Sequence, residues 1–296
     1  MEKIDVSVII VNYNTKQMTN DCIESLINCT KCNKIEIILV DNASTDGSKD
    51  LYENDKRIKY IYSEENLGFG RANNIGIESA LGKYIFMLNS DTIILDDVVS
   101  KLFNFAEKNN DNSLGAVGTC LINYEKQDLL SFGQFITSKR IYHRLLENLK
   151  LHKNTFEEKV YQELNVKGFV EVDFISGADL FIPKSVFSKI NSFDPDFFMY
   201  YEETDLEKRM ADAGFKRYII NVRDIIHLEG GSFDDSVPFR RKILMTKSLK
   251  LYINKHFKGI LKSQIVALSF LILLKDLLKV NYTINQNLTL IKEIFK

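Results

Sequence analysis

The fold of this 296-residue chain is decided by the stretch VDNASTDGS, which occupies residues 40–48. It ends an apolar, β-branched run over residues 35–40 and breaks into Asp, Asn, Ser and Gly. A second run, over residues 84–88, breaks in the same way into Asn89, Ser90 and Asp91. In a parallel α/β sheet, such breaks place acidic and amide side chains at the carboxyl ends of the strands, where ligands bind. We therefore expect both segments to border one ligand site.

Apolar runs alternate with helical patterns throughout the first hundred residues. Strands are predicted over residues 6–11, 35–40, 58–62 and 84–88, and helices over residues 68–81 and around residues 98–105. Alternation of this kind predicts an α/β fold, with a mostly parallel sheet covered by helices on both faces.

The pattern changes after residue 122. Residues 123–167 are charged and rich in Lys and Glu, which predicts a variable excursion with a helix near residues 145–149. Three ordered elements follow: a strand over residues 172–183 that breaks at a Ser-Gly pair, an aromatic turn over residues 192–198, and a helix over residues 204–213 that Gly214 ends. From Pro238 onward the chain is predicted to be helical.

Charge is distributed unevenly along the chain, although the net charge is only -1. Residues 239–296 contain twelve basic and two acidic side chains, for a net charge of +10, and the remainder carries -11. Such asymmetry marks a surface that meets an anionic partner. Nucleic acid is not the expected partner, because the basic residues alternate with aliphatic ones and lack exposed aromatic residues.

The cysteines and the apolar segments favour a cytoplasmic protein. Cys22, Cys29, Cys32 and Cys120 fit a reduced chain, and the Cys-x-x-Cys pair lacks a second pair at zinc-finger spacing. No signal peptide precedes the first strand. The longest uncharged apolar run, residues 265–274, is too short to cross a bilayer of about 30 Å.

Polar residues at the end of the first strand form a candidate base pocket. Asn12, Tyr13 and Asn14 follow that strand, and Asp41 and Asn42 end the predicted neighbouring strand. Backbone groups would frame a pyrimidine ring, whose imide N–H the carboxylate of Asp41 would accept. Ordinary turns also use Asn, Asp and Ser, which remains the structural alternative for this segment.

Two further segments are unusual for purely structural elements. Residues 66–76, NLGFGRANNIG, lack the third glycine of a dinucleotide-binding loop. Close packing at the start of a helix would explain the glycines of this segment, but it would not explain its cluster of Asn side chains. The second segment places Glu202 and Glu203 directly after the apolar and aromatic run of residues 197–201. An apolar wall raises the pKa of a carboxyl group toward the range useful for abstracting a proton.

Taken in order, these segments resemble the motifs of family 2 glycosyltransferases, and most of all their rhamnosyltransferase-like branch, over about residues 4–240. The resemblance implies a GT-A fold whose domain covers residues 1–238, with a nucleotide-sugar half (1–122) and an acceptor and catalytic half (168–238). Residues 239–296 would form a basic helical appendage.

The resemblance also implies the roles of the donor-side residues. Asp41 would meet a uracil or thymine, and Arg71 and Asn74 would lie near the nucleotide phosphates. Asn89, Ser90 and Asp91 occupy the position of the family's Asp-x-Asp motif, with Asn89 in place of the first acid. Asp91 would hold Mg²⁺ or Mn²⁺ together with the phosphates. His227 matches a later histidine of the family that adds a nitrogen ligand, although a histidine after an apolar strand is also a common structural residue.

On the acceptor side, Glu203 matches the acid that takes the proton from the acceptor hydroxyl, with Glu202 or Asp205 as alternatives. The implied activity is inverting transfer from a dTDP- or UDP-sugar, rhamnose or a hexose, to a glycan of bacterial surface polysaccharide. The alternatives are a weakly catalytic scaffolding protein of the same fold and, less consistent with the first loop, a nucleotidyltransferase. The appendage would lie peripherally on the membrane that carries a lipid-linked acceptor, form a homodimer, or pack against the main sheet.

Overall fold

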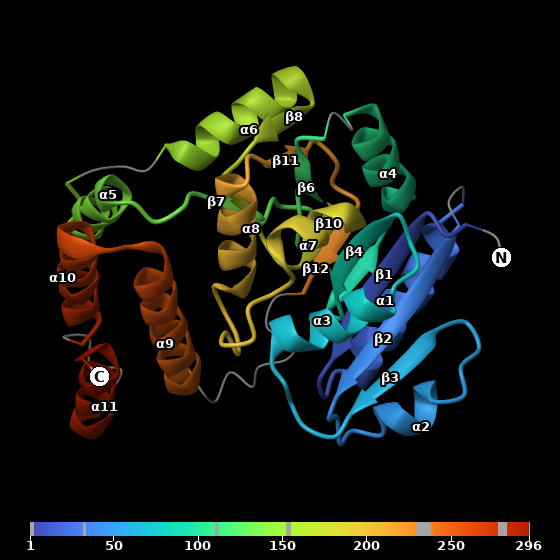
Figure 1. Cartoon of the computed structure of the whole chain (residues 1–296), viewed down its shortest axis with the longest axis horizontal. Coiled ribbons are helices and arrows are strands. Elements are labelled where there is room, and N and C mark those ends of the chain that lie inside the picture. The colour runs from blue at the N-terminus through green and yellow to red at the C-terminus, as the bar shows by residue number, and fades with distance from the viewer. Residues whose placement is uncertain are drawn as a thin grey trace.

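The computed structural model describes residues 3–31, 34–109, 112–151, 155–228, 238–277 and 283–295. A large twisted sheet forms the centre, and a group of C-terminal helices lies to one side of it (Figure 1). Cys32, one member of the Cys-x-x-Cys pair, lies outside the described residues.

The central sheet has eight strands and is mostly parallel, as predicted. Their order is β3 (Lys59–Ser63), β2 (Ile35–Asn42), β1 (Val6–Asn12), β4 (Tyr84–Asn89), β10 (Asp179–Pro183), β6 (Leu114–Thr119), β11 (Lys216–Ile220) and β8 (Phe169–Glu171). The first four strands run parallel to one another. β10 is antiparallel to both of its neighbours, β4 and β6, and β8 is antiparallel to β11.

Strand register aligns the polar residues that end the parallel strands. Asn12 pairs with Asp41 across β1 and β2, and Val11 pairs with Asn89 across β1 and β4. The three strands therefore finish at one edge of the sheet, which is where an α/β sheet binds its ligands. This edge is called the site edge below.

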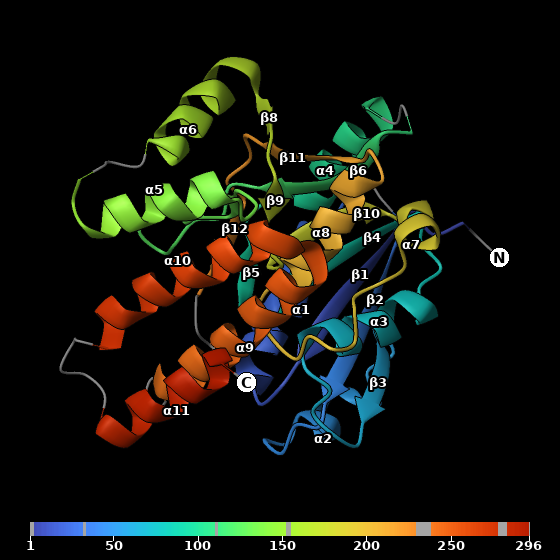
Figure 2. The same cartoon turned by 60° about the vertical axis from the view of Figure 1, so that its left-hand side comes forward.

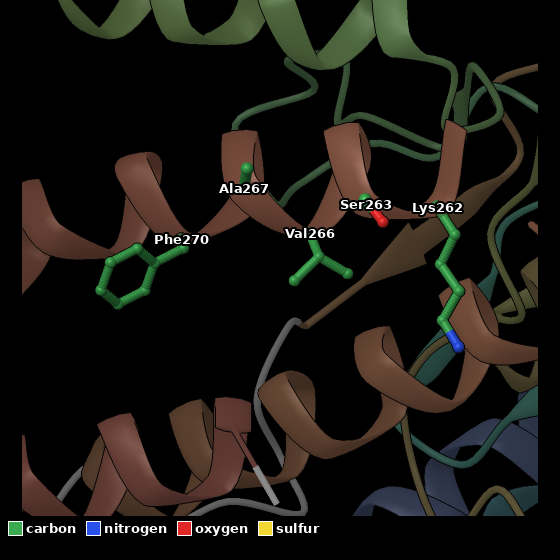
Figure 3. A pocket seen from close by; sticks show the side chains of 5 residues that line it. All are labelled: Lys262, Ser263, Val266, Ala267 and Phe270. Carbon is green, nitrogen blue, oxygen red and sulfur yellow. The ribbon is translucent and has the colours of Figure 1, made fainter. Parts of the chain in front are cut away.

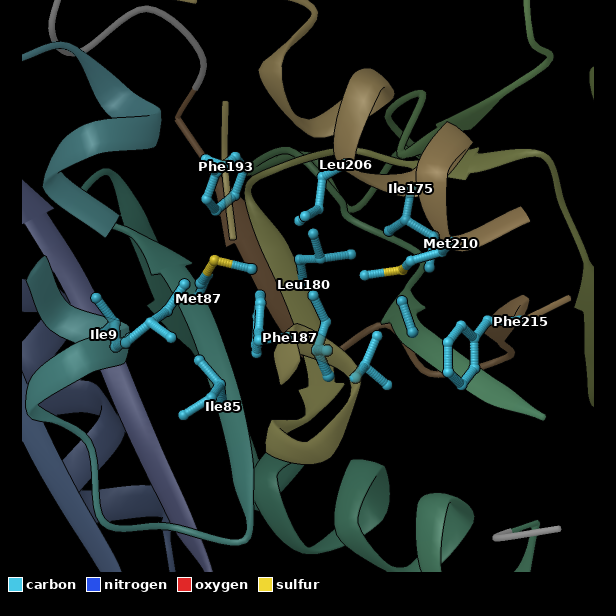
Figure 4. Packing of buried hydrophobic residues seen from close by; sticks show 14 of the residues in the cluster. Ile9, Ile85, Met87, Ile175, Leu180, Phe187, Phe193, Leu206, Met210 and Phe215 are labelled. Atoms are coloured by element: carbon cyan, nitrogen blue, oxygen red, sulfur yellow. The ribbon is translucent and has the colours of Figure 1, made fainter. Parts of the chain in front are cut away.

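Helices cover both faces of the sheet, and this explains why the strands are continuously apolar. On one face, Ile9 belongs to a core with residues of α3 (Phe69–Ser79), α7 (Lys184–Ile190) and α8 (Glu202–Asp212) (Figure 4). On the other, Val8 and Ile10 belong to a core with α1 (Lys16–Cys29) and α4 (Val98–Lys108). Burying each such aliphatic side chain stabilises the fold by about 1.5–3 kcal/mol.

Two small antiparallel sheets flank the site edge. β5 (Thr92–Ile94) pairs with β12 (Ile225–His227), and β7 (Phe132–Gly133) pairs with β9 (Phe174–Ile175). The strand predicted over residues 172–183 is divided into β9 and β10 at its Ser-Gly pair, as expected. α2 (Ser48–Tyr52) follows β2 after the VDNASTDGS stretch.

The excursion is more helical than predicted. The helix expected near residues 145–149 belongs to α5 (Ser138–Asn148), which begins earlier, and α6 (Phe156–Lys167) was not predicted at all. Among the side chains whose burial the structure describes, the buried apolar residues are Ile141 in α5, and Val160 and Leu164 in α6. The apolar face of each helix is therefore narrow and lies among many charged residues. These charges obscured the helical repeat of apolar residues in the sequence.

The C-terminal helices pack against the excursion, against α8 and against one another. α10 (Gly259–Leu277) lies along α5, and α11 (Ile284–Phe295) lies along α9 (Pro238–His256) (Figure 2). A separate core joins Ile141 of α5 to Tyr252 and Ile253 of α9, Ile265 of α10, and Phe197 of the aromatic turn. Among the described residues, no helix combines the length and the hydropathy needed to span a membrane.

Candidate functional site

Asn12 connects the loop that follows β1 to the loop that follows β2 through hydrogen bonds of its side chain. Its Nδ2 donates to Ser44 Oγ at 3.0 Å, and its Oδ1 accepts hydrogen bonds from Thr15 and Thr19. Asn14 has a left-handed backbone (φ 55°), and its Oδ1 accepts the backbone N–H of Thr45 at 2.7 Å. Asn12 is fully buried and the side chains of both residues join the two loops, whereas Tyr13, which is 37% exposed, and Asn14 are open to solvent.

Asp41 is enclosed at the end of β2. Its Oδ1 accepts the backbone N–H of Ser44 at 2.9 Å, and its Oδ2 accepts the hydroxyl of Tyr60 at 2.7 Å. Burial, together with this bond to Asp41, raises the pKa of Tyr60, so the phenol stays a donor. Each carboxylate oxygen retains a second acceptor position, and its predicted contact with a base N–H stays a prediction.

Asn42 and Gly68 connect the end of β2 to the segment before α3 and to the aromatic turn. Asn42 Oδ1 accepts the N–H of Leu67 at 2.8 Å, and its Nδ2 donates to Asn66 and to the carbonyl of Gly68. Gly68 has φ +82°, and a side-chain carbon there would collide with the carbonyl oxygen of Phe198. That same carbonyl accepts the N–H of Phe69 at 3.0 Å.

Arg71 and Asn74 hold the aromatic turn, which is a different role from the phosphate contact expected of them. Arg71 Nε donates to the carbonyl of Pro195 at 2.6 Å. Asn74 makes a two-way bridge with the backbone of Phe193, donating through Nδ2 and accepting through Oδ1, both at 2.9 Å. The bridge uses one of the two N–H groups of the Asn74 amide, so the other can still donate, and the phosphate contact stays a prediction.

Asp91 and His227, the two expected metal ligands, lie close together, and their binding of a metal stays a prediction. Nε2 of His227 is 3.3 Å from Oδ1 of Asp91, and both side chains are largely buried. The pair is brought together by β5 and β12, because His227 pairs with Thr92 and the N–H of Leu228 donates to the carbonyl of Asp91 at 2.9 Å. Ser90 is also buried, with its hydroxyl 3.0 Å from that of Thr15.

The donor atoms of this pair suit a divalent cation that a nucleotide diphosphate also binds. Mg²⁺ and Mn²⁺ both bind carboxylate oxygen, and Mn²⁺ accepts an imidazole nitrogen more readily than Mg²⁺ does. Mg²⁺ usually takes only one or two carboxylates beside substrate phosphates. Over the described ranges, no cluster of three or more His, Cys, Asp or Glu side chains is arranged to hold a metal without such help. Asn89, whose N–H donates to the carbonyl of Ala178 at 3.0 Å, brings no carboxylate.

Asp179 is a buried carboxylate at this edge to which the sequence analysis gave no role. It begins β10, pairs with Leu88 of β4, and has no exposed surface. Its Oδ2 accepts the N–H and the hydroxyl of Thr119 at 2.6 and 2.7 Å. Burial raises its pKa to about 7, although the bonds from Thr119 and the charge of His227 act in the opposite direction. The sequence does contain a signal for this residue, which is a single acid within an otherwise apolar strand segment. An unpaired buried charge is costly, so such an acid is expected to have a specific partner or role.

Glu202 and Glu203 begin α8, two residues earlier than the predicted start of that helix. Tyr200 and Tyr201 precede them with φ values of 70° and 67°, a left-handed backbone that costs non-glycine residues about 1 kcal/mol or more each. Burial raises the pKa of Glu203. Burial first and the charge of Glu203 second raise the pKa of Glu202 well above its ordinary value.

Asp205 does not share that environment, and the structure does not favour it as a base. It is fully buried and accepts hydrogen bonds from Arg209 at 2.9 Å, Lys255 at 2.9 Å and His256 at 2.7 Å. Burial alone would raise its pKa, but the bond from His256 and the charges of Arg209 and Lys255 outweigh burial and lower it. Two of these partners come from α9, so Asp205 joins α8 to the C-terminal helices.

Residues 177–179 bring the base candidates and the metal pair to the same edge. A side-chain carbon on Gly177 would lie 3.3 Å from the ring of Phe69 and 3.7 Å from Cβ of Glu203. Ala178 is hydrogen-bonded to Asn89, two residues before Asp91. Glu203 and Asp91, more than a hundred residues apart in sequence, thus flank one short segment. Asp41 ends a strand at the same edge.

A hollow of about 530 Å³ lies far from these residues, along α10. It is lined by Lys262, Ser263, Val266, Ala267 and Phe270. Figure 3 shows that these side chains project from one helix toward the helices beside it. The hollow has none of the carboxylates or amides of the site edge, so it is a separate surface feature.

Comparisons with known proteins agree with this geometry. Residues 7–167 match the profile of Glycosyl transferase family 2. Glycosyltransferase GlyG of Streptococcus pneumoniae serotype 4 is 29% identical over 187 residues, which are 58% of this chain and 60% of GlyG. This chain thus spans less than two thirds of that relative.

Solved structures support the same fold. The structure of S. aureus TarS residues 1–349 aligns with a TM-score of 0.59 and 14% identity, over 98% of this chain and 80% of that one. The complex of the same TarS fragment with UDP aligns with a TM-score of 0.55 and 14% identity, over 88% of this chain and 69% of that one. The profile covers more than half of the chain, and the strand-end motifs occupy the expected edge of a GT-A sheet. The chain therefore belongs to glycosyl transferase family 2.

Proposed function

We propose that this protein transfers a sugar from a uridine- or thymidine-diphosphate sugar to a hydroxyl of a glycan, with inversion at the anomeric carbon. One observation carries the proposal. Glu203, whose pKa is raised by burial, lies beside the segment that is hydrogen-bonded to Asn89, and Asp91 and His227 follow at the same edge. This neighbourhood supports the proposal that a base and a diphosphate-binding pair share one site.

The nucleotide is proposed to bind over the ends of β1 and β2. Tyr13 offers an exposed ring for stacking, and Asp41 has acceptor capacity left beside its bonds to Ser44 and Tyr60. A UDP complex of the TarS fragment supports a nucleotide with a pyrimidine base. Rhamnose or a hexose as the donor sugar, and bacterial surface polysaccharide as the product, remain part of the proposal.

Glu203 would take the proton of the acceptor hydroxyl as that oxygen forms its bond to the anomeric carbon. The bond from this carbon to the diphosphate oxygen breaks on the opposite face, and the nucleoside diphosphate leaves with the electron pair. Asp91 and His227 would hold Mg²⁺ or Mn²⁺, which when bound neutralises negative charge on the leaving group. No covalent intermediate with the protein is needed.

The C-terminal helices are proposed to meet the membrane that carries a lipid-linked acceptor. Residues 239–296 have a net charge of +10, and large apolar side chains are exposed on the adjoining helices α5 and α10, notably Tyr142, Ile260 and Leu271. Cationic and apolar side chains together favour binding at an anionic lipid surface. A homodimer through the same helices is the competing arrangement.

Glu203→Gln tests catalysis separately from binding. The variant should retain the UDP-induced rise in melting temperature while donor turnover falls by about 10²–10⁴-fold, because a neutral amide cannot accept the proton. Turnover is measured as UDP release from UDP-sugars in the presence of Mn²⁺. If the wild-type protein binds UDP but turns over no donor of a uridine- and thymidine-diphosphate sugar panel, the scaffolding alternative is correct.

A further inference from the structure

The backbone that leads into the base candidates is strained. Tyr200 and Tyr201, directly before Glu202 and Glu203, both have a left-handed conformation. Non-glycine residues keep such a conformation only where the surrounding structure holds them in it. Among the described residues, no side chain caps the N-terminus of α8. The contacts that hold this segment therefore have to come from other elements.

One face of α9 supplies such contacts. Four of its residues follow one another at intervals of four, three and one positions, so that they lie along one side of the helix. They are Ser248, Tyr252, Lys255 and His256, and they are called the α9 face below.

Two members of the α9 face contact the backbone before Glu203. Ser248 Oγ donates to the carbonyl of Met199 at 2.7 Å. The ring of Tyr252 lies 5.6 Å from the ring of Tyr201. Both Ser248 and Tyr252 are buried, so water does not compete for these contacts. They fix the residues on either side of the first left-handed position.

The other two members bind the start and the end of the same segment. Lys255 binds Asp194 at the start, and it binds Asp205 at the end, at 2.9 Å. His256 Nε2 is 2.7 Å from Oδ1 of the same Asp205. Asp205 has no exposed surface and lies two residues after Glu203, in the first turn of α8. The α9 face therefore contacts the chain on both sides of Glu203.

We propose that the α9 face positions Glu203, by fixing the backbone before it through Met199 and the helical turn after it through Asp205. Its members are positioning residues, because they act through these two residues. The inference rests on the proposed function and gives the C-terminal helices a role in the reaction itself. Loss of one contact should let the strained segment relax and displace the Glu203 carboxylate.

The test measures kcat and KM for nucleoside diphosphate release by the full-length chain with Mn²⁺, well below the melting temperature of each variant. His256→Leu removes the donor to Asp205. Its kcat should fall by about 10–100-fold, because a displacement of about 1 Å can cost about 100-fold in rate. The KM for the donor and the affinity for UDP should stay within about twofold, since Asn12 and Asn14 join the nucleotide-side loops to each other.

His256→Gln is the conservative variant. The amide of Gln keeps an N–H donor at a similar reach, so kcat should return to within about twofold of the wild type. A structural role of the ring alone predicts the opposite, because Leu replaces its apolar surface better than Gln does. If His256→Gln loses as much kcat as His256→Leu, the bond to Asp205 does not position Glu203.

Ser248→Ala tests the contact on the other side of Glu203, and Thr246→Val is its matched control. Both changes remove a buried hydroxyl of α9, but the hydroxyl of Thr246 donates to the carbonyl of Lys242 within the same helix, at 2.8 Å. Ser248→Ala should lower kcat by about tenfold. Thr246→Val should leave kcat within about twofold of the wild type.

The Glu203→Gln background shows whether the α9 face acts through Glu203. There, His256→Leu should change kcat by less than about twofold, because the group that it displaces no longer accepts a proton. Independent losses that multiply in the double variant would overturn the inference.

The outcomes separate this inference from the proposed function. If Glu203→Gln loses turnover while His256→Leu and Ser248→Ala lower only the melting temperature, the inference is wrong and the function stands. If Glu203→Gln keeps the turnover of the wild type, or if the wild type turns over no donor, both are wrong. If His256→Leu does not fold, Ser248→Ala is put through the same cycle with the same expectation.

Discussion

Burial governs the acidity of the carboxyl groups at the site edge. It raises the pKa of Glu202, Glu203, Glu207 and Asp179. Asp205 differs only because three basic side chains surround it. The same residue type therefore serves two purposes on one helix. Glu203 is a candidate base at the site, and Asp205 is an anchor for another helix.

The raised pKa of Glu203 predicts the pH dependence of turnover. A base acts in its deprotonated form, so kcat/KM should fall as the pH drops through the pKa of Glu203. Because burial raises that pKa above its ordinary value of 4.5, the acidic limb should lie above that value. The measurement is kcat/KM from about pH 4 to about pH 8. A limb at or below the ordinary value for glutamate would contradict Glu203 as the base.

The ionised carboxyl group of Glu202 should lower the free energy of unfolding. The residue is 4% exposed, and its Oε2 has no hydrogen-bond partner within the described part of the chain. The pKa of Glu202 is higher in the folded than in the unfolded chain. The folded state is therefore not destabilised by this residue at a pH below its unfolded pKa. Stability is lost as the pH rises through the folded pKa, because the buried carboxyl group must then ionise.

Glu202→Gln mimics the protonated form. It should raise the free energy of unfolding by about 1 kcal/mol or more at about pH 8, and much less at about pH 5. Urea unfolding at the two pH values measures the difference. A variant that is destabilised equally at both would show that the Glu202 carboxylate is favourably bound.

At the scale of elements, two contacts hold α8, which carries the candidate base, in place. The start of α3 contacts the aromatic turn through Gly68, Arg71 and Asn74, and this turn leads directly into α8. On the opposite side, Asp205 ties α8 to α9. The position of Glu203 therefore depends on residues that never contact a substrate.

Gly68→Ala should disrupt the first of these contacts. The backbone is left-handed at φ +82°, and the added carbon would meet the carbonyl of Phe198. We expect a loss of about 3 kcal/mol in unfolding free energy, and a fall in turnover through displacement of α8. Gly168→Ala is the control, since Gly168 has φ +79° with nothing within 4 Å, and should cost only about 1 kcal/mol. Equal losses for the two variants would exclude the steric explanation.

Asp205→Ala should disrupt the second contact. Removing a fully buried carboxylate leaves the charges of Arg209 and Lys255 without their shared partner, which costs about 3–5 kcal/mol. Asp212→Ala, on the same helix but with a 58% exposed side chain paired with Lys208, should change stability by less than about 1 kcal/mol. Chemical denaturation of both variants gives the comparison. A loss below about 1 kcal/mol for Asp205→Ala would contradict the anchoring role.

For the whole molecule, the main feature is the separation of an acidic part, residues 1–238, from a basic helical part, residues 239–296. The two share a core through Tyr252, Ile253 and Phe197, so the C-terminal helices are integrated with α5 and α8. Any lipid contact would therefore hold the acceptor side of the site edge at a fixed position relative to the membrane.

Anionic vesicles should bind the protein, and salt should weaken that binding. Lys258→Gln, at an exposed position between α9 and α10, should reduce binding by about fivefold, because each basic residue near the surface contributes about 1 kcal/mol. Lys56→Gln, exposed in the donor half, should not change it. Co-sedimentation with vesicles containing phosphatidylserine measures both. Binding that is unchanged at high salt, or reduced equally by the two variants, would refute the membrane contact.

The sequence by itself determined the parallel half of the sheet and the identity of most residues at its edge. Continuous apolar runs that end in Asp, Asn and Ser are local signals, so β1, β2 and β4 and the positions of Asp41 and Asp91 followed from them. Buried groups gave weaker signals. Asp179 is one acid in an apolar strand, and α6 shows only two buried residues among many charged ones.

The tertiary structure decided what each polar residue does. Arg71 and Asn74 contact residues 119 or more positions away, and Asp205 meets partners on a helix 50 residues later. His227 reaches Asp91 only because β12 pairs with β5. A sequence pattern reports local periodicity and residue type, whereas the partner of a hydrogen bond or an ion pair is fixed by how distant elements pack.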